Sequence, residues 1–564
     1  MGKKRYTVTS ALLYANGPVH IGHIAGAYLP ADIYVRYLKG KGHDVAFICG
    51  SDEHGAAITL QAKKEGISPK EIINKYHSIN KKAFDDFGIN FSIYHKTSEE
   101  LHHRTAQEFF EILEENNAFT KKTTKQFYDK KNNQFLADRY ISGECPKCNN
   151  LGAYGDQCER CGSALSPEEL INPKSTLSGN TPVKKETSHW YLPMQNHEKW
   201  LKEWIEKGIL NNKHHHNPEN WKSQVLGQCK SWIDGGLKER AMTRDLDWGV
   251  KVPVKNSDGK VLYVWLDAPI GYISATKQWA ADNNKKWEDY WQNAETELVH
   301  FIGKDNIVFH CIIFPIILKE HKNYILPTNV PANEFLNLEG KKLSTSRNWA
   351  IWLHEYLEDF KGHEDALRYT LCAAAPESKD TDFTWEYFQA KNNNELVAIY
   401  GNFINRVVVL THKYWGGRVP EQKNLTNYDK EVLKKLANYP EKIGVSIEKF
   451  KFREALKELI NLARLGNKYL ADTEPWKIKT TNEERAKTIL NIAIQIAASL
   501  AILSEPFMPF SSKKLQEMLA IKSITWDNTG DVIVNENHQI NKSSHLFEKI
   551  EDEQIKKELD KLKS

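Results

Sequence analysis

A strand, a glycine–proline turn and the start of a helix follow one another directly near the N-terminus of the chain. Residues 6–13, YTVTSALL, are rich in β-branched and apolar residues, so we expect a buried strand that ends at Tyr14. Turn residues occupy 15–18, and apolar residues then recur at helical spacing, with a kink or restart at Pro30. A buried strand that leads into a helix is typical of an α/β fold with a parallel sheet.

Two histidines flank a glycine at this helix start, in the sequence GPVHIGHI of residues 17–24. The first turn of a helix has free backbone N–H groups and a partial positive charge, which favour an anion such as phosphate. His20 and His23 share one face, so both can donate to the same phosphate, and Gly22 leaves room for a flat ring. The octapeptide alone fits an ATP site, but it also fits a capped helix with two ordinary surface histidines.

Three later runs are also strand-like. Residues 43–50, HDVAFICG, form a buried strand that leads into the polar cluster SDEHG of residues 51–55, where parallel sheets usually keep their sites. Residues 261–266 and 298–303 are further apolar runs of strand length. We therefore expect one parallel sheet that is interrupted by an insertion.

The insertion contains four of the eight cysteines, arranged as two C-x-x-C knuckles: Cys145, Cys148, Cys158 and Cys161. Four thiolates on two tight turns match a closed, tetrahedral structural zinc site; the alternative is two disulfides or free thiols. The other four cysteines are scattered, so we expect buried thiols of a reducing compartment. The run His214–His216 invites a metal interpretation, but its flanking residues favour a solvated loop.

Length and composition set wider limits. A chain of 564 residues with 40% hydrophobic content can form three to five domains, and its net charge of +4 neither requires nor excludes nucleic acid. No signal-peptide stretch follows Met1, so we expect a cytoplasmic protein. Residues 489–503 are strongly apolar but carry a polar residue at every fourth position, which indicates a buried bundle helix and no membrane span.

A second signature appears in residues 338–347, LEGKKLSTSR, which alone form a weak phosphate-loop candidate. Residues 20–23, HIGH, and 342–346, KLSTS, resemble the HIGH and KMSKS signatures of class I aminoacyl-tRNA synthetases, in the same order and with the cysteine-bearing insertion between them. From residue 6 to about 547 the chain is similar to the methionyl-tRNA synthetase family. The specific marks are LYANG at 13–17, the four cysteines, TRDL at 243–246, WLDAPIGY at 265–272, GKD at 303–305 and EPW at 474–476.

The resemblance implies an α/β fold: a Rossmann-like parallel sheet split by a zinc-bearing insertion, followed by an α-helical bundle that binds the anticodon. Six segments are expected in chain order. They are the first catalytic half (1–115), the connective insertion with the zinc knuckle (116–225), the second catalytic half (226–325), the KMSKS loop and stem-contact region (326–388), the anticodon-binding bundle (389–545) and a charged C-terminal helix or linker (546–564).

The resemblance also implies the activity of a methionine–tRNA ligase. Methionine attacks ATP to give methionyl-adenylate and magnesium pyrophosphate, and methionine is then transferred to the 3′ end of initiator and elongator tRNAs for protein biosynthesis. One structural zinc ion is the expected cofactor, and ATP with magnesium is a substrate. We expect no membrane partner and a monomer, with a homodimer only if a further C-terminal domain exists.

The family's functional positions map onto this sequence residue by residue. The catalytic set is His20, His23, Arg244 and Lys342, and the ATP-binding set is His20, Gly22, His23, Asp305, Lys342, Ser344 and Thr345. The methionine-binding set is Leu12, Tyr14, Asp52, Trp265, Ala268, Pro269, Tyr272, Phe309 and His310, with Asp52 as the partner of the substrate ammonium group. An aromatic-lined slot suits a polarizable thioether, although Phe309 and the further position Phe314 fit ordinary core equally well. Asn405 and Trp476 are the tRNA-binding candidates, since an amide can read a base edge and an indole can stack on an unpaired base.

The sequence departs from the family pattern at two places. Thr345 replaces the second lysine of KMSKS and brings no charge, so Lys341, Lys342 or Arg347 supplies the lost cation, or the loop depends more on magnesium. Val409 and Lys413 stand one and two turns after Asn405, where relatives often carry further polar readers. The sequence does not decide what compensates at either place.

Three other functions were weighed. A synthetase for leucine, valine or isoleucine shares both signatures but usually carries a large editing domain, for which this insertion is too short and too cysteine-rich. A small-molecule nucleotidyltransferase shares the histidine motif but has no use for the helical bundle. A zinc-containing RNA-binding scaffold with a degenerate active site is supported by Thr345 alone.

Overall fold

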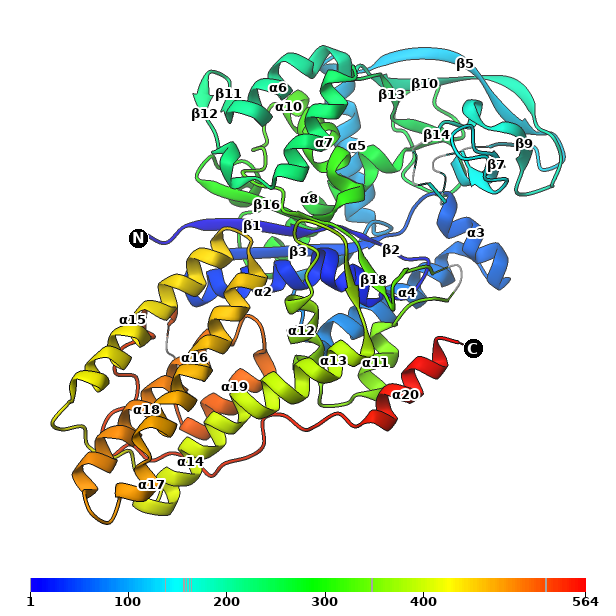
Figure 1. Cartoon of the computed structure of the whole chain (residues 1–564). Coiled ribbons are helices and arrows are strands. Elements are labelled where there is room, and N and C mark those ends of the chain that lie inside the picture. Colours follow the sequence, from blue (N-terminus) through cyan, green and yellow to red (C-terminus); the bar gives the residue numbers. More distant parts are fainter. Residues whose placement is uncertain are drawn as a thin grey trace.

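The structure of the chain is a computed structural model. It describes residues 2–136, 138–155, 158, 160–161, 163, 165–345, 348–522 and 525–563. A central α/β body connects two outlying parts (Figure 1). The cysteine-bearing strands lie at one end of this body, and the helical bundle projects from the other end.

A six-stranded sheet whose paired strands all run parallel forms the centre of the α/β body. Its strands, in the order in which they pair, are β17 (Ala332–Asn333), β16 (Thr296–Gly303), β1 (Arg5–Ser10), β3 (Asp44–Asp52) and β2 (Leu13–Tyr14), with β4 (Ile93–Lys96) also paired to β3. Helix α2 (Leu29–Gly40) covers one face, and α5 (Glu100–Glu115), α8 (Val264–Asp282) and α10 (Phe314–His321) cover the other (Figure 1). The Rossmann-like parallel sheet predicted from the sequence is confirmed.

The strand predictions are right for two runs and incomplete for a third. Residues 43–50 and 298–303 lie in β3 and β16, at the centre of the sheet. The N-terminal run is broken at Ala11 and Leu12, so that β1 ends at Ser10 and a short β2 follows. The N–H of Ala11 still donates to the carbonyl of Phe301, which keeps this break against β16.

The prediction of a parallel strand at residues 261–266 is wrong. Only its beginning is extended, in β15 (Lys260–Leu262), and this strand pairs antiparallel with β14 (Thr243–Asp245) outside the central sheet. The helix α8 begins at Val264, and the N–H groups of Leu266 and Asp267 both donate to the carbonyl of Tyr263. Short apolar runs fit a buried helix start as well as a strand, and here tertiary packing selects the helix.

The helix that follows the GPVHIGHI segment has three parts. A first turn, α1 (Ile21–His23), leads into a π-helical turn (Ile24–Tyr28), and α2 restarts with Pro30 in its first turn. The restart predicted at Pro30 is confirmed, because proline is well tolerated where its missing N–H has no partner to lose.

The described part of the insertion between α5 and α8 contains two larger antiparallel sheets, the two-stranded pairs β11 (Ile209–Leu210) with β12 (Lys213–His214) and β14 with β15, and the helices α6 and α7. One sheet consists of β5 (Thr120–Asp129), β6 (Gln134–Phe135), β10 (Val183–Leu192) and β13 (Arg240–Ala241). The smaller sheet consists of β7 (Ile141–Glu144), β8 (Ala153–Tyr154) and β9 (Ile171–Ser175), and it carries the first cysteine knuckle after β7. The helices α6 (Glu198–Lys207) and α7 (Ser223–Asp234) follow and pack on each other.

The solvated loop predicted at His214–His216 is correct for His214 alone. His214 is exposed in the short strand β12 (Lys213–His214), which pairs with β11 (Ile209–Leu210). His216 is buried and its ring stacks on Trp221, with a centroid distance of 4.9 Å. The aromatic partner lies five residues further along the chain, and polar flanking residues gave no sign of this packing.

A short sheet and two helices join the catalytic body to the bundle. The sheet contains β18 (Leu336–Leu338), β19 (Lys341–Lys342) and β20 (Thr381–Phe383), and the helices are α11 (Leu353–Asp359) and α12 (Glu364–Ala373). The bundle then comprises α13 (Trp385–Lys391), α14 (Asn402–Trp415), α15 (Asn427–Glu448), α16 (Phe452–Thr473), α17 (Pro475–Ile478), α18 (Glu483–Leu503) and α19 (Pro509–Leu519), with a π-helical segment (Asn392–Gly401) between α13 and α14.

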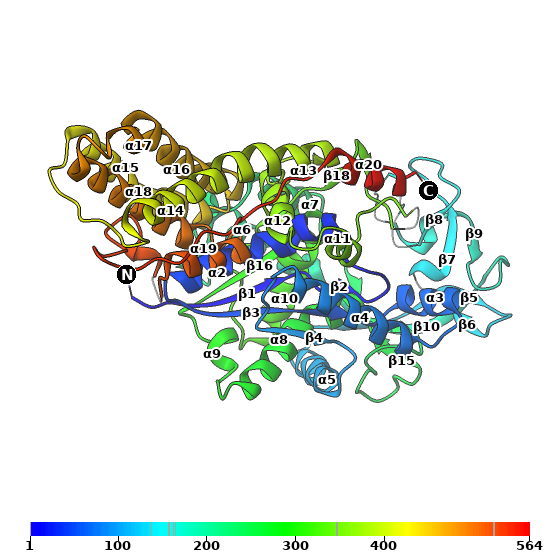
Figure 2. The same ribbon diagram turned by 90° about the horizontal axis from the view of Figure 1, so that it is seen from below.

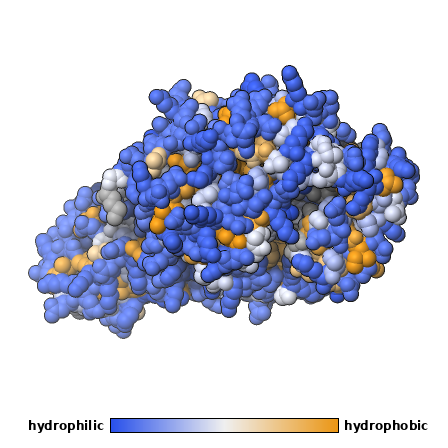
Figure 3. Space-filling model, turned by 90° about the horizontal axis from the view of Figure 1, so that it is seen from above, coloured by the Kyte–Doolittle hydropathy of each residue, from blue (hydrophilic) through white to orange (hydrophobic). Residues whose placement is uncertain are grey.

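The bundle predictions agree with the structure. The apolar stripe predicted on α16, from Phe452 through Leu459 to Leu470, is buried. Within the described chain, α18 is the one helix long and apolar enough to cross a membrane, but 94% of its most apolar window is buried inside the protein. It is therefore a core helix, as its regularly spaced polar residues predicted. The face of the molecule seen in Figure 3 is mostly hydrophilic, with apolar residues scattered over it.

The C-terminal stretch runs from the bundle back to the catalytic body (Figure 2). It ends in α20 (Asp552–Lys561), where Lys557 and Lys561 pair with Asp359 of α11. The predicted charged helix is confirmed, and it packs against the rest of the chain.

Candidate active site

The helix start that carries the first signature is joined by backbone hydrogen bonds to residues just after the second signature, more than 300 residues further along the chain. The N–H of Ile21 donates to the carbonyl of Ile351 at 3.1 Å, and the N–H of Leu353 donates to the carbonyl of Val19 at 2.9 Å. The short bridge between His20 and Trp352 lies between these bonds. The helix start and the segment after the lysine-rich loop therefore form one unit.

His20 and His23 are held by a reciprocal cap at the helix start. The N–H groups of Gly22 and His23 donate to Nδ1 of His20, at 3.1 and 3.4 Å, and the N–H of His20 donates to Nδ1 of His23 at 3.3 Å. Because a backbone N–H can only donate, Nδ1 of each ring must accept, so each ring carries its proton on Nε2. The two rings are stacked with centroids 3.6 Å apart. The pair therefore offers two parallel Nε2–H donors.

Both histidines are neutral in this environment. Burial lowers the pKa of His20 far below its ordinary value, and the neighbouring His23 lowers it further. Burial also lowers the pKa of His23 to about 4. Near pH 7 the pair therefore acts on an anion through N–H dipoles and the helix N-terminus, without a formal charge.

Gly22 is covered by the second signature loop. A Cβ atom built on Gly22 would lie 2.5 Å from Cδ1 of Leu343, so this side chain packs directly on Gly22 and would have to shift for a larger residue. A flat ring packed on Gly22, as the family resemblance implies for adenine, needs the space that Leu343 occupies. The side chain of Leu343 must therefore move before a base can lie there.

The loop residues around Leu343 differ in exposure and in their contacts. Lys342 is exposed, with Nζ 5.3 Å from the ring centroid of Phe335, and Lys341 lies 4.6 Å from that of Trp349. Ser344 exchanges two backbone hydrogen bonds with Trp349, and Thr345 is exposed. Ser346 and Arg347 lie outside the described residues, so the candidate cation Arg347 stays a prediction.

Asp305, the candidate ribose contact, follows the end of β16. A Cβ atom at Gly303 would lie 2.6 Å from Oδ1 of Asp305, which explains why the GKD segment begins with glycine. The intervening Lys304 pairs with Glu334 and Asp380, at 2.6 and 2.8 Å, and so ties this turn to the segment around β18 and β20. The turn lies at the carboxyl end of the parallel strand, where α/β sheets bind ligands.

The aromatic members of the candidate methionine pocket contact one another. Trp265 and Phe309 pack edge to face with centroids 4.9 Å apart. The hydroxyl of Tyr272 lies 2.9 Å from Nε2 of His310, whose Nδ1 lies 3.0 Å from the carbonyl of Asn306. Because a carbonyl can only accept, Nδ1 of His310 donates and Nε2 accepts from Tyr272. Burial lowers the pKa of His310 to about 4, so this ring is neutral.

The remaining pocket candidates line the start of α8 and the edge of the sheet. A Cβ atom at Gly271 would lie 2.8 Å from Cδ1 of Leu12, so these two positions touch. Tyr14 is 42% exposed on β2, whereas Pro269 is buried inside α8 and Ala268 is half-buried beside it. Phe314 is fully buried against Tyr272 and Trp291, which is the ordinary core role weighed for it.

Asp52 lies at the end of β3, next to a buried polar network that the sequence did not reveal. The members of this network come from three places in the fold: His54 follows β3, His102 lies on α5 and Asp267 lies on α8. The polar cluster SDEHG pointed to this edge of the sheet. No spacing rule connects the cluster with His102, about 50 positions further along the chain, or with Asp267, more than 200 positions further along.

Arg244, the remaining catalytic candidate, lies on β14 at the border of the insertion. Its guanidinium stacks on the ring of Tyr263 at 3.7 Å and donates to the carbonyl of its own strand residue Thr243 at 3.0 Å. Its role in the reaction stays a prediction.

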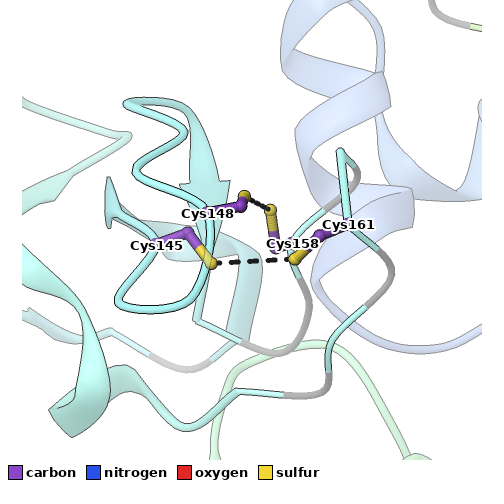
Figure 4. Close-up of side chains that lie close together, drawn as sticks. All are labelled: Cys145, Cys148, Cys158 and Cys161. Atoms are coloured by element: carbon purple, nitrogen blue, oxygen red, sulfur yellow. Dashed lines mark hydrogen bonds between the residues drawn. The ribbon is translucent and has the colours of Figure 1, made fainter.

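The four knuckle cysteines come together as predicted (Figure 4). Sγ of Cys145 lies 3.8 Å from that of Cys161, and Sγ of Cys148 lies 3.6 Å from that of Cys158. A disulfide would need about 2.05 Å. Four sulfurs around zinc at about 2.3 Å lie about 3.8 Å apart, so the cluster could hold a zinc ion. The scattered cysteines Cys49, Cys229, Cys311 and Cys372 are buried thiols, as predicted.

Asn405 and Trp476 lie in the bundle, on α14 and α17 respectively, and both are half-buried. Asn405 accepts a hydrogen bond from the hydroxyl of Ser543 at 2.9 Å. Arg406, which the sequence did not single out, stacks on Trp476 with its guanidinium 4.8 Å from the ring centroid. Val409, one turn further on, is 44% exposed.

The parallel sheet and the cap-held histidine pair beneath a lysine-bearing loop define a class I aminoacyl-tRNA synthetase. The comparisons with known proteins agree. Residues 6–408 match the family model of class I tRNA synthetases (M), and residues 419–563 match that of the anticodon binding domain of methionyl tRNA ligase. The chain belongs to the methionine–tRNA ligase family.

Curated relatives and solved structures support this assignment. The methionine–tRNA ligase of Christiangramia forsetii is 59% identical over all of this chain, and that of Cytophaga hutchinsonii is 60% identical over 99% of it. The chain covers 81% of the length of both relatives. The same fold occurs in Mycobacterium tuberculosis methionyl-tRNA synthetase in complex with methionyl-adenylate. That match has a TM-score of 0.80, with 21% identity over 96% of this chain and 99% of that one.

The low pKa of His23 predicts a pH-dependent stability. Its pKa is about 4 in the folded chain but about 6.5 when unfolded, so between these values the unfolded chain binds a proton that the folded chain does not. The free energy of unfolding should therefore fall as pH is lowered from 6.5 towards 4. His23→Gln keeps an acceptor for the N–H of His20 but does not titrate, so it should reduce this slope by up to about 1.4 kcal/mol per pH unit. Urea unfolding at a series of pH values measures the slope, and equal slopes would contradict the neutral-pair interpretation.

Proposed function

We propose that the chain activates methionine with ATP and transfers it to the 3′ end of initiator and elongator methionine tRNAs. The single observation that carries the chemistry is the neutral His20–His23 pair, which presents two Nε2–H donors at a helix start directly beneath the lysine-bearing loop. Such preorganised donors stabilise negative charge that develops on transferring phosphates.

In the proposed formation of methionyl-adenylate, each of the candidate residues has a separate role. The methionine carboxylate attacks the α-phosphorus of ATP, and pyrophosphate leaves with magnesium. His20 and His23 donate to the phosphates, Asp305 binds the ribose, and Lys342 closes over the leaving pyrophosphate. We propose that the loop first opens, which takes Leu343 off Gly22 and frees space for adenine, and then closes again, a gating motion common at such sites.

Pyrophosphate exchange in the wild type and in a variant of the exposed Lys342 is the first test of this function. Methionine-dependent ATP–pyrophosphate exchange should be observed, and none of the other nineteen amino acids should replace methionine. Lys342→Ala should lower kcat for exchange by about two to three orders of magnitude, with a smaller effect on the KM for ATP, because the contact forms chiefly in the transition state.

Thr345→Ala is the matched control in the same loop. Thr345 is exposed and brings no charge, so its loss should reduce exchange far less. A more damaging Thr345→Ala would contradict the role proposed for Lys342. Absence of methionine-dependent exchange in the wild type would contradict the function itself.

We propose that the four knuckle cysteines bind one structural zinc ion. Their Sγ spacings of 3.6 and 3.8 Å fit a closed tetrahedral site, and the cysteines fill all four positions, so the ion would order the insertion without taking part in catalysis.

Native mass spectrometry should therefore detect one zinc ion per chain. Cys145→Ser should lower zinc content and loosen the insertion, and limited proteolysis would detect this as faster cleavage near residues 145–161. Cys49→Ser, at a buried cysteine in the central sheet, is the control and should leave zinc content unchanged. A metal-free protein from zinc-replete growth, or a disulfide in the knuckle, would remove the zinc proposal.

We propose that Asn405 and Trp476 read the anticodon of the tRNA. Base stacking on an aromatic side chain contributes roughly 1–3 kcal/mol, so Trp476→Ala should lower kcat/KM for tRNA about tenfold to hundredfold. Arg406 already lies on this ring, so a base must displace it or use the other face.

Trp476→Ala should leave methionine activation unchanged, because pyrophosphate exchange does not involve the bundle. Exchange, tRNA charging and thermal unfolding should be measured on the same preparation. An equal fall in exchange and charging, or a large drop in Tm, would show that Trp476 is simply a core residue.

The segment boundaries predicted from the sequence, with a catalytic body split by the insertion at 116–225 and a bundle at 389–545, stay part of this proposal. So does action in the cytoplasm as a monomer. The family models, which match residues 6–408 and 419–563, support a catalytic part followed by an anticodon-binding part.

A further inference from the structure

Three buried side chains from separate elements meet behind Asp52. Oδ2 of Asp267 lies 2.7 Å from Nδ1 of His54, and Oδ1 of Asp267 lies 2.6 Å from Nε2 of His102. The exposed fractions of His54, His102 and Asp267 are 3%, 0% and 1%. This cluster joins the end of β3 to α5 and α8, two of the helices on that face of the sheet.

The cluster is a hydrogen-bonded network and differs from the cysteine site in its spacing. Ligand atoms about 2.0–2.1 Å from a tetrahedral zinc ion lie about 3.3 Å apart. The two contacts of Asp267 are much shorter than this and have the length of charge-assisted hydrogen bonds. Each carboxylate oxygen of Asp267 therefore accepts one imidazole N–H directly.

His54 has a second ring contact, with His103. Its Nε2 lies 3.3 Å from Nε2 of His103, and burial and then the charge of His54 lower the pKa of His103 to about 4. Burial alone would lower the pKa of His54, but Asp267, Asp52 and Glu53 together raise it. A protonated His54 would donate from both nitrogens in this geometry, to Asp267 and to a neutral His103.

Asp52 adjoins this network. The backbone N–H of His54 lies 3.4 Å from Oδ1 of Asp52, and this side chain is only 4% exposed. Burial, and then the negative charge of Asp267, raises the pKa of Asp52 to about 7, whereas the charge of His54 lowers it. The other titratable neighbours of this corner include Glu53 directly after β3, Tyr14 on β2, His95 and Lys96 on β4, His102 and His103 on α5 and Tyr272 on α8.

We propose that His54 is a positioning residue for the amino-acid substrate: clamped as an imidazolium between Asp267 and His103, it offsets the buried negative charge and keeps the Asp52 carboxylate ionised for the substrate ammonium group. The inference rests on the proposed function, in which Asp52 receives that group. Two carboxylates near each other in a buried site cannot both stay ionised without a compensating cation. His54 is that cation before the substrate arrives.

His54→Asn tests the role, because the asparagine amide can still donate to Asp267 but carries no charge. In ATP–pyrophosphate exchange the KM for methionine should rise about tenfold at pH 7.5, and the KM for ATP should stay within twofold. The acid limb of the pH profile of kcat/KM for methionine should move to higher pH, because Asp52 then loses the neighbouring positive charge. A merely structural role would not move this limb.

His77→Asn is the matched control. His77 is a comparably buried histidine on α4 (Pro69–Asp86) that contacts Ser51, and burial lowers its pKa to about 3, so its loss removes a ring but no charge. It should leave the KM for methionine within twofold and the acid limb in place. An unchanged KM for methionine in His54→Asn, or an equal rise in the KM for ATP, would overturn the proposal.

A second measurement does not depend on the variant's folding. Neutron diffraction from wild-type crystals should show deuterons on both ring nitrogens of His54 and on one nitrogen of His103. A single deuteron on His54 would overturn the proposal. Wild-type protein without methionine-dependent exchange would contradict the proposed function, whereas normal wild-type exchange with an unaffected His54→Asn would overturn this inference alone.

Discussion

The buried guanidinium of Arg368 is the point at which the catalytic body, α12 and the bundle meet. It is fully buried and donates to Asp32 of α2 at 2.6 Å, and to the carbonyls of Phe507 and Pro506 just before α19. Burial alone would raise the pKa of Asp32, but Arg36 and Arg368 outweigh this and hold it below its ordinary value. A buried charge is tolerated only when its partners stay in place. The bundle is therefore held in one orientation relative to the sheet.

This fixed frame lets the catalytic groups act without formal charge. The bonds of Ile351 and Leu353 hold the helix start that carries His20 and His23, and the reciprocal cap then sets which nitrogen of each ring bears the proton. Donors that are already oriented need no reorganisation when charge develops on phosphate. In the proposed function the formal charge comes from Lys342 on the exposed loop, so that binding and release of the phosphates would depend on loop movement rather than on proton transfer.

Local chemistry made much of this molecule predictable from the sequence. The strands at 43–50 and 298–303, the apolar stripe of α16 and the four cysteines each carry their signal within a few residues, and the structure agrees with all of them. The run at 261–266 was mispredicted because its apolar residues fit two kinds of burial. The network of His54, His102 and Asp267 could not be predicted, since its members are brought together only when α5 and α8 pack on the sheet. For the same reason, nothing in the sequence indicated that Leu343 covers Gly22.

The hydrogen bond between Tyr272 and His310 determines which side chain the proposed amino-acid pocket can accept. The Nδ1–H of His310 donates a hydrogen bond to the carbonyl of Asn306, so Nε2 accepts a hydrogen bond from the Tyr272 hydroxyl. Both donors are therefore used within the protein. Trp265 and Phe309 supply apolar walls. A hydroxyl or amide side chain would lose its water on entering between these apolar walls, whereas a thioether loses little on burial. The binding free energies of apolar competing amino acids differ from that of methionine by only about 1–3 kcal/mol per methylene. Their exclusion therefore depends on the shape of these aromatic walls.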